Sequence, residues 1–128
     1  MFANIDAVKK EYEEQLKIYQ LAEKERDKLI LQRQQLEAQL TENELVKTEL
    51  QLLQPGTNVF KLIGPTLVKQ DLEESKATVD KRLEYITEEI KRSEKSLVDV
   101  TNKVNSSKSK VENALKEVQQ KLATPQKA

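Results

Sequence analysis

Paired carboxylates are the residues of this sequence most able to do chemistry, because one carboxyl group can donate a proton while its neighbour accepts one. Such pairs occur at Glu73-Glu74 and Glu88-Glu89. Acid–base catalysis also needs a pocket that shifts the pKa of one partner. Both pairs lie in long segments that are predicted to be helical, where no pocket is expected. We interpret them as solvent-exposed helix faces and not as a catalytic site.

No other residue pattern indicates an enzyme, a metal site or a cofactor. The chain has no His and no Cys, so the usual zinc ligands and a thiol nucleophile are missing. It has only two Gly and no glycine-rich phosphate loop. The sequence therefore predicts a protein that is not an enzyme and binds no cofactor.

The charge balance argues against nucleic acid as a partner. The chain has 22 basic and 22 acidic residues, whereas nucleic-acid binding needs surplus Lys or Arg to replace counterions. One local basic cluster is present, and we interpret it as a solvated helix face, with an anionic partner as the alternative. The cluster consists of Lys91, Arg92, Lys95, Lys103, Lys108 and Lys110.

The composition predicts an elongated, folded, water-soluble protein. Charged residues make up 34% and aromatic residues 4%, which is too few large apolar groups for a compact core. Asp6, Lys9 and Lys10 interrupt any signal-peptide run, and no segment reaches the ~20 apolar residues of a membrane helix. We expect a cytoplasmic location and no membrane contact.

The positions of Gly and Pro divide the chain into two helical arms and a connector. Pro55-Gly56 and Gly64-Pro65 lie near the middle and Pro125 near the end, so both flanking segments are free of helix breakers. We predict a single domain over residues 1–128. Its parts are a first helix over 5–53, a β-hairpin connector over 54–70, a second helix over 71–122 and a tail over 123–128.

A heptad repeat in the second arm predicts a coiled coil. Eleven of its 14 seam positions are apolar. These positions are Leu72, Lys76, Val79, Leu83, Ile86, Ile90, Ser93, Leu97, Val100, Val104, Ser107, Val111, Ala114 and Val118.

The first arm carries a weaker repeat that also suits a coiled coil. Nine of its 14 seam positions are apolar, and the stems of Arg26 and Arg33 are expected to lie along the seam with their charged ends in water. Folding the arms antiparallel about the connector places Tyr19 near Val104. The seam positions are Ile5, Val8, Tyr12, Gln15, Tyr19, Ala22, Arg26, Leu29, Arg33, Leu36, Leu40, Asn43, Lys47 and Leu50.

The connector combines two β-prone runs around a Gly64-Pro65 turn. A lone two-stranded hairpin is marginal in water, and its edges offer unpaired N–H and C=O groups. We therefore expect it to pair with hairpins of other chains, the alternative being a turn that merely packs on the helix ends. The predicted oligomerisation residues are Val59, Phe60, Leu62, Ile63, Leu67 and Val68.

Three segments of the sequence closely resemble the β-type prefoldin family. They are LEAQLTEN at 36–43, FKLIGPTLVKQ at 60–70 and ATVDKRLEYI at 77–86. The resemblance implies a hexamer of two α-type and four β-type subunits, whose hairpins form a β-barrel platform carrying six coiled coils. It also implies that the coil tips hold unfolded clients such as actin and tubulin, without ATP, and pass them to the cytosolic group II chaperonin.

Apolar residues at the open ends of the arms are the candidate client-binding groups. Fraying of the helix ends would expose them to a client, whereas the alternative is that they simply close the coil. These residues are Phe2, Ile5, Val8, Val118 and Leu122. A rival function is a structural coiled-coil tether that joins a larger assembly without binding clients.

Overall fold

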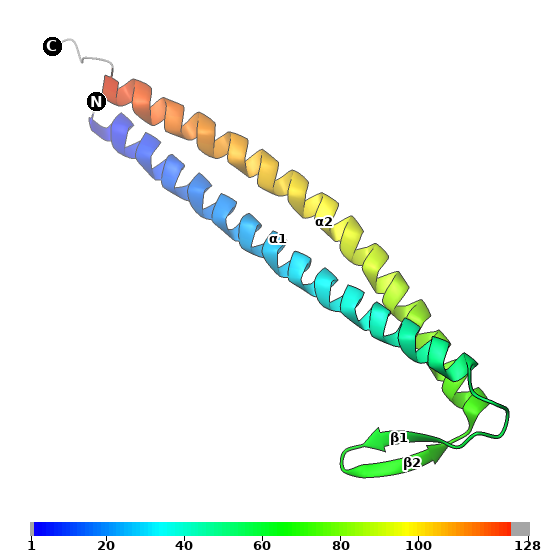
Figure 1. The fold of residues 1–128 in the computed structure, drawn as a ribbon. Helices are drawn as coiled ribbons and strands as arrows, with labels where there is room; N and C mark the ends of the chain where they lie inside the picture. The colour runs from blue at the N-terminus through cyan, green and yellow to red at the C-terminus, as the bar shows by residue number, and fades with distance from the viewer. Residues whose placement is uncertain (1, 124–128) are drawn as a thin grey trace. The chain divides into compact units, whose positions relative to one another are not determined.

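The computed structural model describes the backbone of residues 2–123 and the side chains of residues 4–123. In chain order it contains helix α1 (Phe2–Gln51), strand β1 (Val59–Ile63), strand β2 (Thr66–Gln70) and helix α2 (Leu72–Ala123) (Figure 1). The predicted mainly α fold, with two long helices and a small antiparallel β-hairpin between them, is confirmed. Helix α1 begins earlier than the predicted 5–53 and ends two residues sooner, while α2 is shifted by one residue from the predicted 71–122. The tail beyond Ala123 lies outside the described residues.

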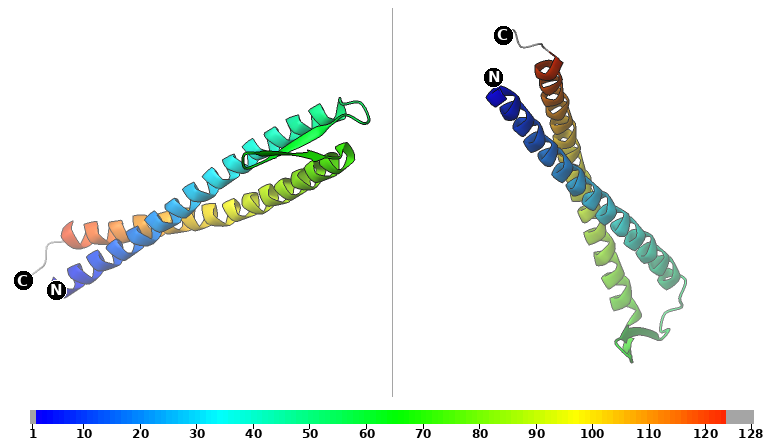
Figure 2. Two further views of the ribbon diagram at one scale, coloured as in Figure 1. Left: turned by 90° about the horizontal axis from the view of Figure 1, so that it is seen from below. Right: turned by 90° about the vertical axis from the view of Figure 1, so that its left-hand side faces the viewer.

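The chain divides into two units, each built from a segment of both helices. Unit 1 combines α1 up to Leu31 with α2 from Lys95 onward, and unit 2 spans Gln32–Glu94 and contains the β-hairpin. In each unit the two helical segments run antiparallel and side by side (Figures 1 and 2). The predicted seam positions are buried or half-buried in both helices. The heptad pattern therefore identified the faces through which the helices pack.

The core of unit 1 forms around a small residue. Ala22 is 1% exposed and clusters with Val100 and Val104, and Tyr19 and Leu29 pack against this cluster. The contact between Tyr19 and the cluster of Val104 agrees with the predicted antiparallel pairing. A methyl side chain at the seam lets the helix backbones approach closely, so the larger side chains around it fill the remaining space.

The core of unit 2 joins the two helices to the hairpin. Leu50, near the end of α1, clusters with Leu72 and Val79 of α2, and all three are buried. Val59 of β1 and Leu83 of α2 pack against this cluster. Burying such side chains stabilises the folded chain by about 1.5–3 kcal/mol each. The hairpin is therefore packed against the coiled coil through the first residue of β1.

Two cationic seam residues of α1 form ion pairs with α2. The Nη2 atom of Arg33 lies 2.7 Å from Oε1 of Glu94, and the Nζ atom of Lys47 lies 3.0 Å from Oδ1 of Asp80. The hydrogen bond to Glu94 raises the pKa of the Arg33 guanidinium, so this group stays charged. These two charged seam residues therefore join the helices by ion pairs.

The second helix begins at a side-chain cap. The backbone N–H of Glu74 donates to Oδ2 of Asp71 at 3.3 Å, which satisfies a donor that has no partner within the helix. Glu73 and Glu74 follow in the first turn, where negative charge interacts favourably with the helix dipole. The local sequence therefore fixes where the hairpin ends and α2 starts.

Candidate oligomerisation and client-binding surfaces

The hairpin closes through a two-residue turn whose backbone requires glycine. Gly64 has a φ angle of 57°, and the ring of Pro65 holds the next φ angle near −65°. A positive φ followed by a negative one is the pattern of a type II′ turn, whose twist matches that of paired strands. The turn places Ile63 opposite Thr66 and continues in register to Val59 opposite Gln70.

Both faces of the hairpin carry apolar side chains. Residues directly opposite each other share a face, so Phe60, Leu62 and Leu67 lie on one side with Lys69. Val59, Ile63 and Val68 lie on the other face. Phe60, Leu62 and Leu67 are 56%, 67% and 66% exposed. An isolated chain therefore leaves large apolar groups of the hairpin in water, which favours burial by another chain.

The backbone of the hairpin also has hydrogen-bonding groups that no further strand within residues 2–123 pairs with. Among the described residues β1 and β2 form a two-stranded sheet, so each strand has one edge without a neighbouring strand. Unpaired N–H and C=O groups at such edges can form a ladder with further strands. The hairpin can therefore join a larger sheet by backbone pairing while its side chains become buried.

Val59 differs from the other predicted oligomerisation residues. Its side chain is half-buried against the cluster of Leu50, Leu72 and Val79 in its own chain. Phe60, Leu62, Ile63, Leu67 and Val68 are all exposed. Val59 thus fixes the hairpin on the helices, and the remaining five residues are available to other chains.

The predicted client-binding residues lie at the open end of unit 1. Ile5 and Val8 of α1 and Val118 of α2 are half-buried. Leu122 is 61% exposed. The side chain of Phe2 lies outside the described residues. The ends of the two helices lie side by side in both views (Figure 2).

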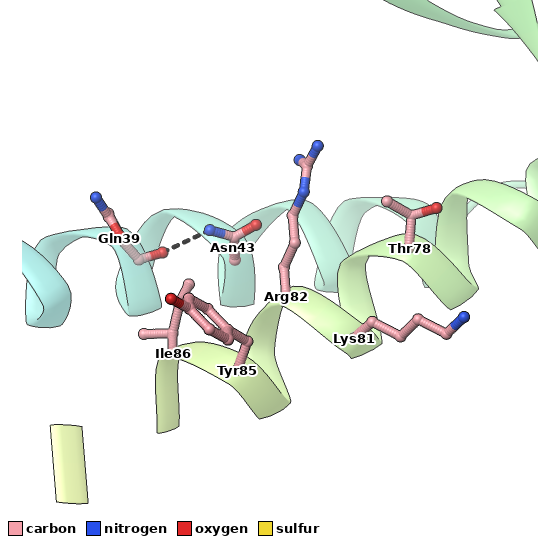
Figure 3. A pocket seen from close by; sticks show the side chains of 7 residues that line it. All are labelled: Gln39, Asn43, Thr78, Lys81, Arg82, Tyr85 and Ile86. Atoms are coloured by element: carbon pink, nitrogen blue, oxygen red, sulfur yellow. Dashed lines mark hydrogen bonds between the residues drawn. The ribbon is translucent and has the colours of Figure 1, made fainter. Parts of the chain in front are cut away.

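A groove of about 430 Å³ lies on unit 2, between α1 and α2. The Nδ2 atom of Asn43 donates to the backbone carbonyl of Gln39 at 2.8 Å, as Figure 3 shows. The lining of the groove contains no carboxylate. Its lining consists of Gln39, Asn43, Thr78, Lys81, Arg82, Tyr85 and Ile86.

Two searches of the described residues bear on other kinds of site. No group of three or more His, Cys, Asp and Glu side chains within residues 4–123 is arranged to hold a metal ion. No helix in the described part of the chain has the length and hydropathy needed to cross a membrane.

Sequence reasoning missed several exposed apolar residues that lie off the seam. In unit 1, Leu21 and Val98 are 66% and 61% exposed. In unit 2, Leu45 and Leu52 are 62% and 78% exposed. For Leu45 and Leu52 the sequence did carry a signal. They are seven residues apart, which is the spacing of a second heptad repeat outside the seam.

Comparisons with known proteins identify a family for this arrangement. Residues 13–121 match the family model described as "Prefoldin subunit". The chain is 46% identical over 108 residues to the "Probable prefoldin subunit 6" of Caenorhabditis briggsae, covering 84% of each chain. It is 52% identical over 95 residues to the "Prefoldin subunit 6" of Homo sapiens, covering 74% of each. The quoted sequence segments look most like subunit 6 within the family, and these relatives confirm that resemblance.

A solved structure shows the same fold at low sequence identity. The prefoldin beta subunit from Thermococcus strain KS-1 superposes with a TM-score of 0.53 at 18% identity. The match covers 89% of this chain and 94% of that one. The arrangement of two long helices around a β-hairpin is therefore shared with that subunit.

Proposed function

Because this chain belongs to the prefoldin family, we propose that it is a β-type subunit of a hetero-hexameric co-chaperone of two α-type and four β-type subunits. The complex binds unfolded proteins such as actin and tubulin chains and passes them to the cytosolic group II chaperonin. The subunit works in the cytoplasm without ATP, cofactor or metal, and catalyses no reaction.

The observation that carries this proposal is the exposed, unpaired hairpin. Phe60, Leu62 and Leu67 form an exposed apolar face, and within residues 2–123 each strand has one edge without a neighbouring strand. A closed β-barrel built from several such hairpins removes the edges and buries these faces. The helices already pack against each other within the chain, so assembly needs nothing from the seam.

Client binding is assigned to the open end of the coil. Leu122 is exposed there, and Ile5, Val8 and Val118 are half-buried beside it. Fraying of the last helical turns adds their surface to that of Leu122. Burial of each such side chain contributes about 1.5–3 kcal/mol, so a single tip binds weakly. Several tips acting on one client raise the overall affinity through effective concentration, and transfer stays possible because each contact is weak.

The assembly proposal is tested by co-expressing this chain with candidate α-type and β-type prefoldin subunits. Native mass spectrometry of the purified complex is expected to show a hexamer that contains this chain. Recovery of this chain only as a free monomer, with all partner subunits folded and present, would contradict the proposal.

Client binding is tested separately, because a structural tether would assemble without it. The hexamer is expected to slow aggregation of denatured actin in a light-scattering assay without ATP. A hexamer that assembles fully but gives no protection would assign the chain to the tether function instead.

A further inference from the structure

A second uncharged stripe follows α1 in unit 2, on a face other than the seam, and ends at Leu52 in the turn directly after the helix. Its members alternate at spacings of four and three residues, as in a coiled coil. All of them are exposed. At 3.6 residues per turn, Leu45 is turned about 140° away from the buried Leu50. We call this surface the outer stripe: Gln34, Ala38, Thr41, Leu45, Thr48 and Leu52.

Covering the outer stripe would bury exposed apolar surface without breaking the hydrogen bonds of its hydroxyl groups. Leu45 and Leu52 are 62% and 78% exposed, so most of their apolar surface faces water. The hydroxyl of Thr41 donates to the backbone carbonyl of Glu37 at 3.1 Å, and that of Thr48 donates to Glu44 at 3.0 Å. These hydroxyl donors already have partners within the helix, so covering them leaves no hydrogen-bond donor unsatisfied.

The charged residues that border the outer stripe are all acidic. Glu42 and Glu49 follow the stripe positions on one side, and Glu37 and Glu44 precede them on the other. In a heptad these are the e and g positions, which form ion pairs with a partner helix and select that partner. Like charge on both sides therefore demands the opposite charge on whatever covers the stripe.

The two basic residues of the same helical segment form ion pairs with α2, and one of them also pairs with the border residue Glu37. Arg33 forms its ion pairs with Glu94 at 2.7 Å and Glu37 at 3.3 Å, and Lys47 pairs with Asp80 at 3.0 Å. Glu94 and Asp80 belong to α2, so these cations are directed toward the seam. The outer face of this segment therefore keeps a net negative border around an apolar centre.

We propose that the outer stripe docks a basic amphipathic helix of another protein. Apolar side chains of that helix cover Leu45, Leu52 and the small residues between them, and its Lys or Arg residues pair with Glu42, Glu44 and Glu49. The surface lies on the helix that leads into the hairpin, and the docked helix runs along residues 34–52.

A second copy of this chain does not fit the same surface through its own outer stripe. Two stripes facing each other would place Glu42, Glu44 and Glu49 against the same residues of the other copy. Like charges across a helix interface are destabilising and select against the pair. The surface therefore favours a partner of opposite charge over self-association.

The test uses the full chain and two designed helical peptides, each roughly three heptads long. Both carry Leu at the a and d positions, and they differ only in Lys or Glu at the e and g positions. Fluorescence anisotropy is expected to show binding of the Lys peptide, weakened by added salt because the ion pairs are exposed. Equal affinity for both peptides, or no binding of the Lys peptide, would overturn the proposal.

Charge reversal on the protein makes the test specific for this surface. The triple variant Glu42→Lys, Glu44→Lys, Glu49→Lys is expected to bind the Glu peptide more tightly than the Lys peptide. A matched variant changes the net charge equally in unit 1, at Glu13, Glu14 and Glu112, each to Lys. This variant should still bind the Lys peptide more tightly than the Glu peptide. If it too binds the Glu peptide more tightly, the effect comes from net charge alone.

The apolar part is tested by Leu45→Gln with Leu52→Gln. Binding of the Lys peptide is expected to weaken at least about tenfold, which corresponds to roughly 1.4 kcal/mol. The matched variant Leu21→Gln with Val98→Gln removes two exposed apolar groups from unit 1 and should bind as the original chain does. Analytical ultracentrifugation checks the other possible occupant. If the original chain sediments as a dimer and the variant Leu45→Gln with Leu52→Gln sediments as a monomer, the occupant is a second copy of this chain.

Discussion

The Nη2 atom of Arg33 donates a 2.7 Å hydrogen bond to Oε1 of Glu94, a residue 61 positions further along the chain. Arg33 occupies a seam position at which the heptad pattern calls for an apolar residue. Pairing with Glu94 satisfies its charge only in one alignment of the two helices. A seam that contains such pairs therefore discriminates against shifted registers as well as holding the helices together.

The first prediction concerns the coupling between these two residues. In a double-mutant cycle of Arg33→Ala and Glu94→Ala, thermal unfolding is expected to show a favourable coupling that shrinks as salt is added. The physical reason is that both side chains are partly exposed, so mobile ions screen their attraction. A coupling that is unchanged at high salt would contradict this account. Lys91 with Glu88, an ion pair at 3.9 Å within one helix, supplies a comparison in which no register is selected.

The second prediction concerns Ser93, whose hydroxyl oxygen is buried without a hydrogen-bond partner. Ser93→Ala removes that hydroxyl and also favours the helix, so the free energy of unfolding is expected to rise by about 1 kcal/mol. Chemical denaturation measures this change. Ser106→Ala is the matched control, because Ser106 is exposed in the same helix. A gain for Ser93→Ala no larger than that of the control would show that the buried hydroxyl costs nothing.

The third prediction concerns the turn of the hairpin. Gly64→Ala places a side chain at a φ angle of 57°, which costs about 1–2 kcal/mol for an L-residue. No atom lies within 4 Å of the added carbon, so the cost comes from the backbone and not from a clash. Faster hydrogen exchange is expected at the amides of β1 and β2, with helix amides unchanged.

A chain with D-alanine at the same position, prepared by peptide ligation, is the control for that substitution. D-residues favour positive φ, so its hairpin amides should exchange as slowly as those of the original chain. Equal exchange in the L- and D-alanine chains would contradict the conformational explanation.

The fourth prediction concerns the open end of the coil. In an assembled hexamer, changing Phe2, Ile5 and Leu122 to Ser is expected to reduce protection of denatured actin only partly, because the other subunits keep their tips. Each lost apolar side chain removes up to about 1.5–3 kcal/mol of burial. Light scattering measures the protection, and native mass spectrometry checks that the hexamer is intact.

The matched control for the tip variant changes Ile18, Leu21 and Val98 to Ser. These residues are exposed in unit 1 but lie away from its open end. Their variant should protect actin as well as the original hexamer does. Full protection by the tip variant would move the client-binding site elsewhere on the subunit.

Periodicity and the positions of Gly and Pro predicted much of the fold. The heptads of residues 72–118 marked the buried face of α2, because a helix that packs on one partner shows a single apolar stripe. The turn at Gly64 was also predicted, since it depends on neighbouring residues alone. The packing of Val59 against the cluster of Leu50, Leu72 and Val79 was not predictable, because it depends on how the hairpin folds back onto the helices.

The outer stripe was missed for a related reason. Helix α1 carries two heptads, one through Leu36, Asn43 and Leu50 and another through Ala38 and Leu45. Hydrophobic spacing shows that both faces can pack, but it does not show which face meets α2. Only the exposure of Leu45 in the folded chain identifies the second heptad as lacking a partner within residues 4–123.

The central claim, that the hairpin joins this chain to other subunits, is tested most directly by Phe60→Asp with Leu62→Asp. Both residues lie on one exposed face of β1, and burying two carboxylates there in a closed barrel would be costly. Leu21→Asp with Val98→Asp places the same charges at exposed sites of unit 1. Native mass spectrometry of co-expressed subunits is expected to show hexamer with the unit 1 variant and none with the hairpin variant, whose circular dichroism remains helical. Full hexamer containing the hairpin variant would contradict the account.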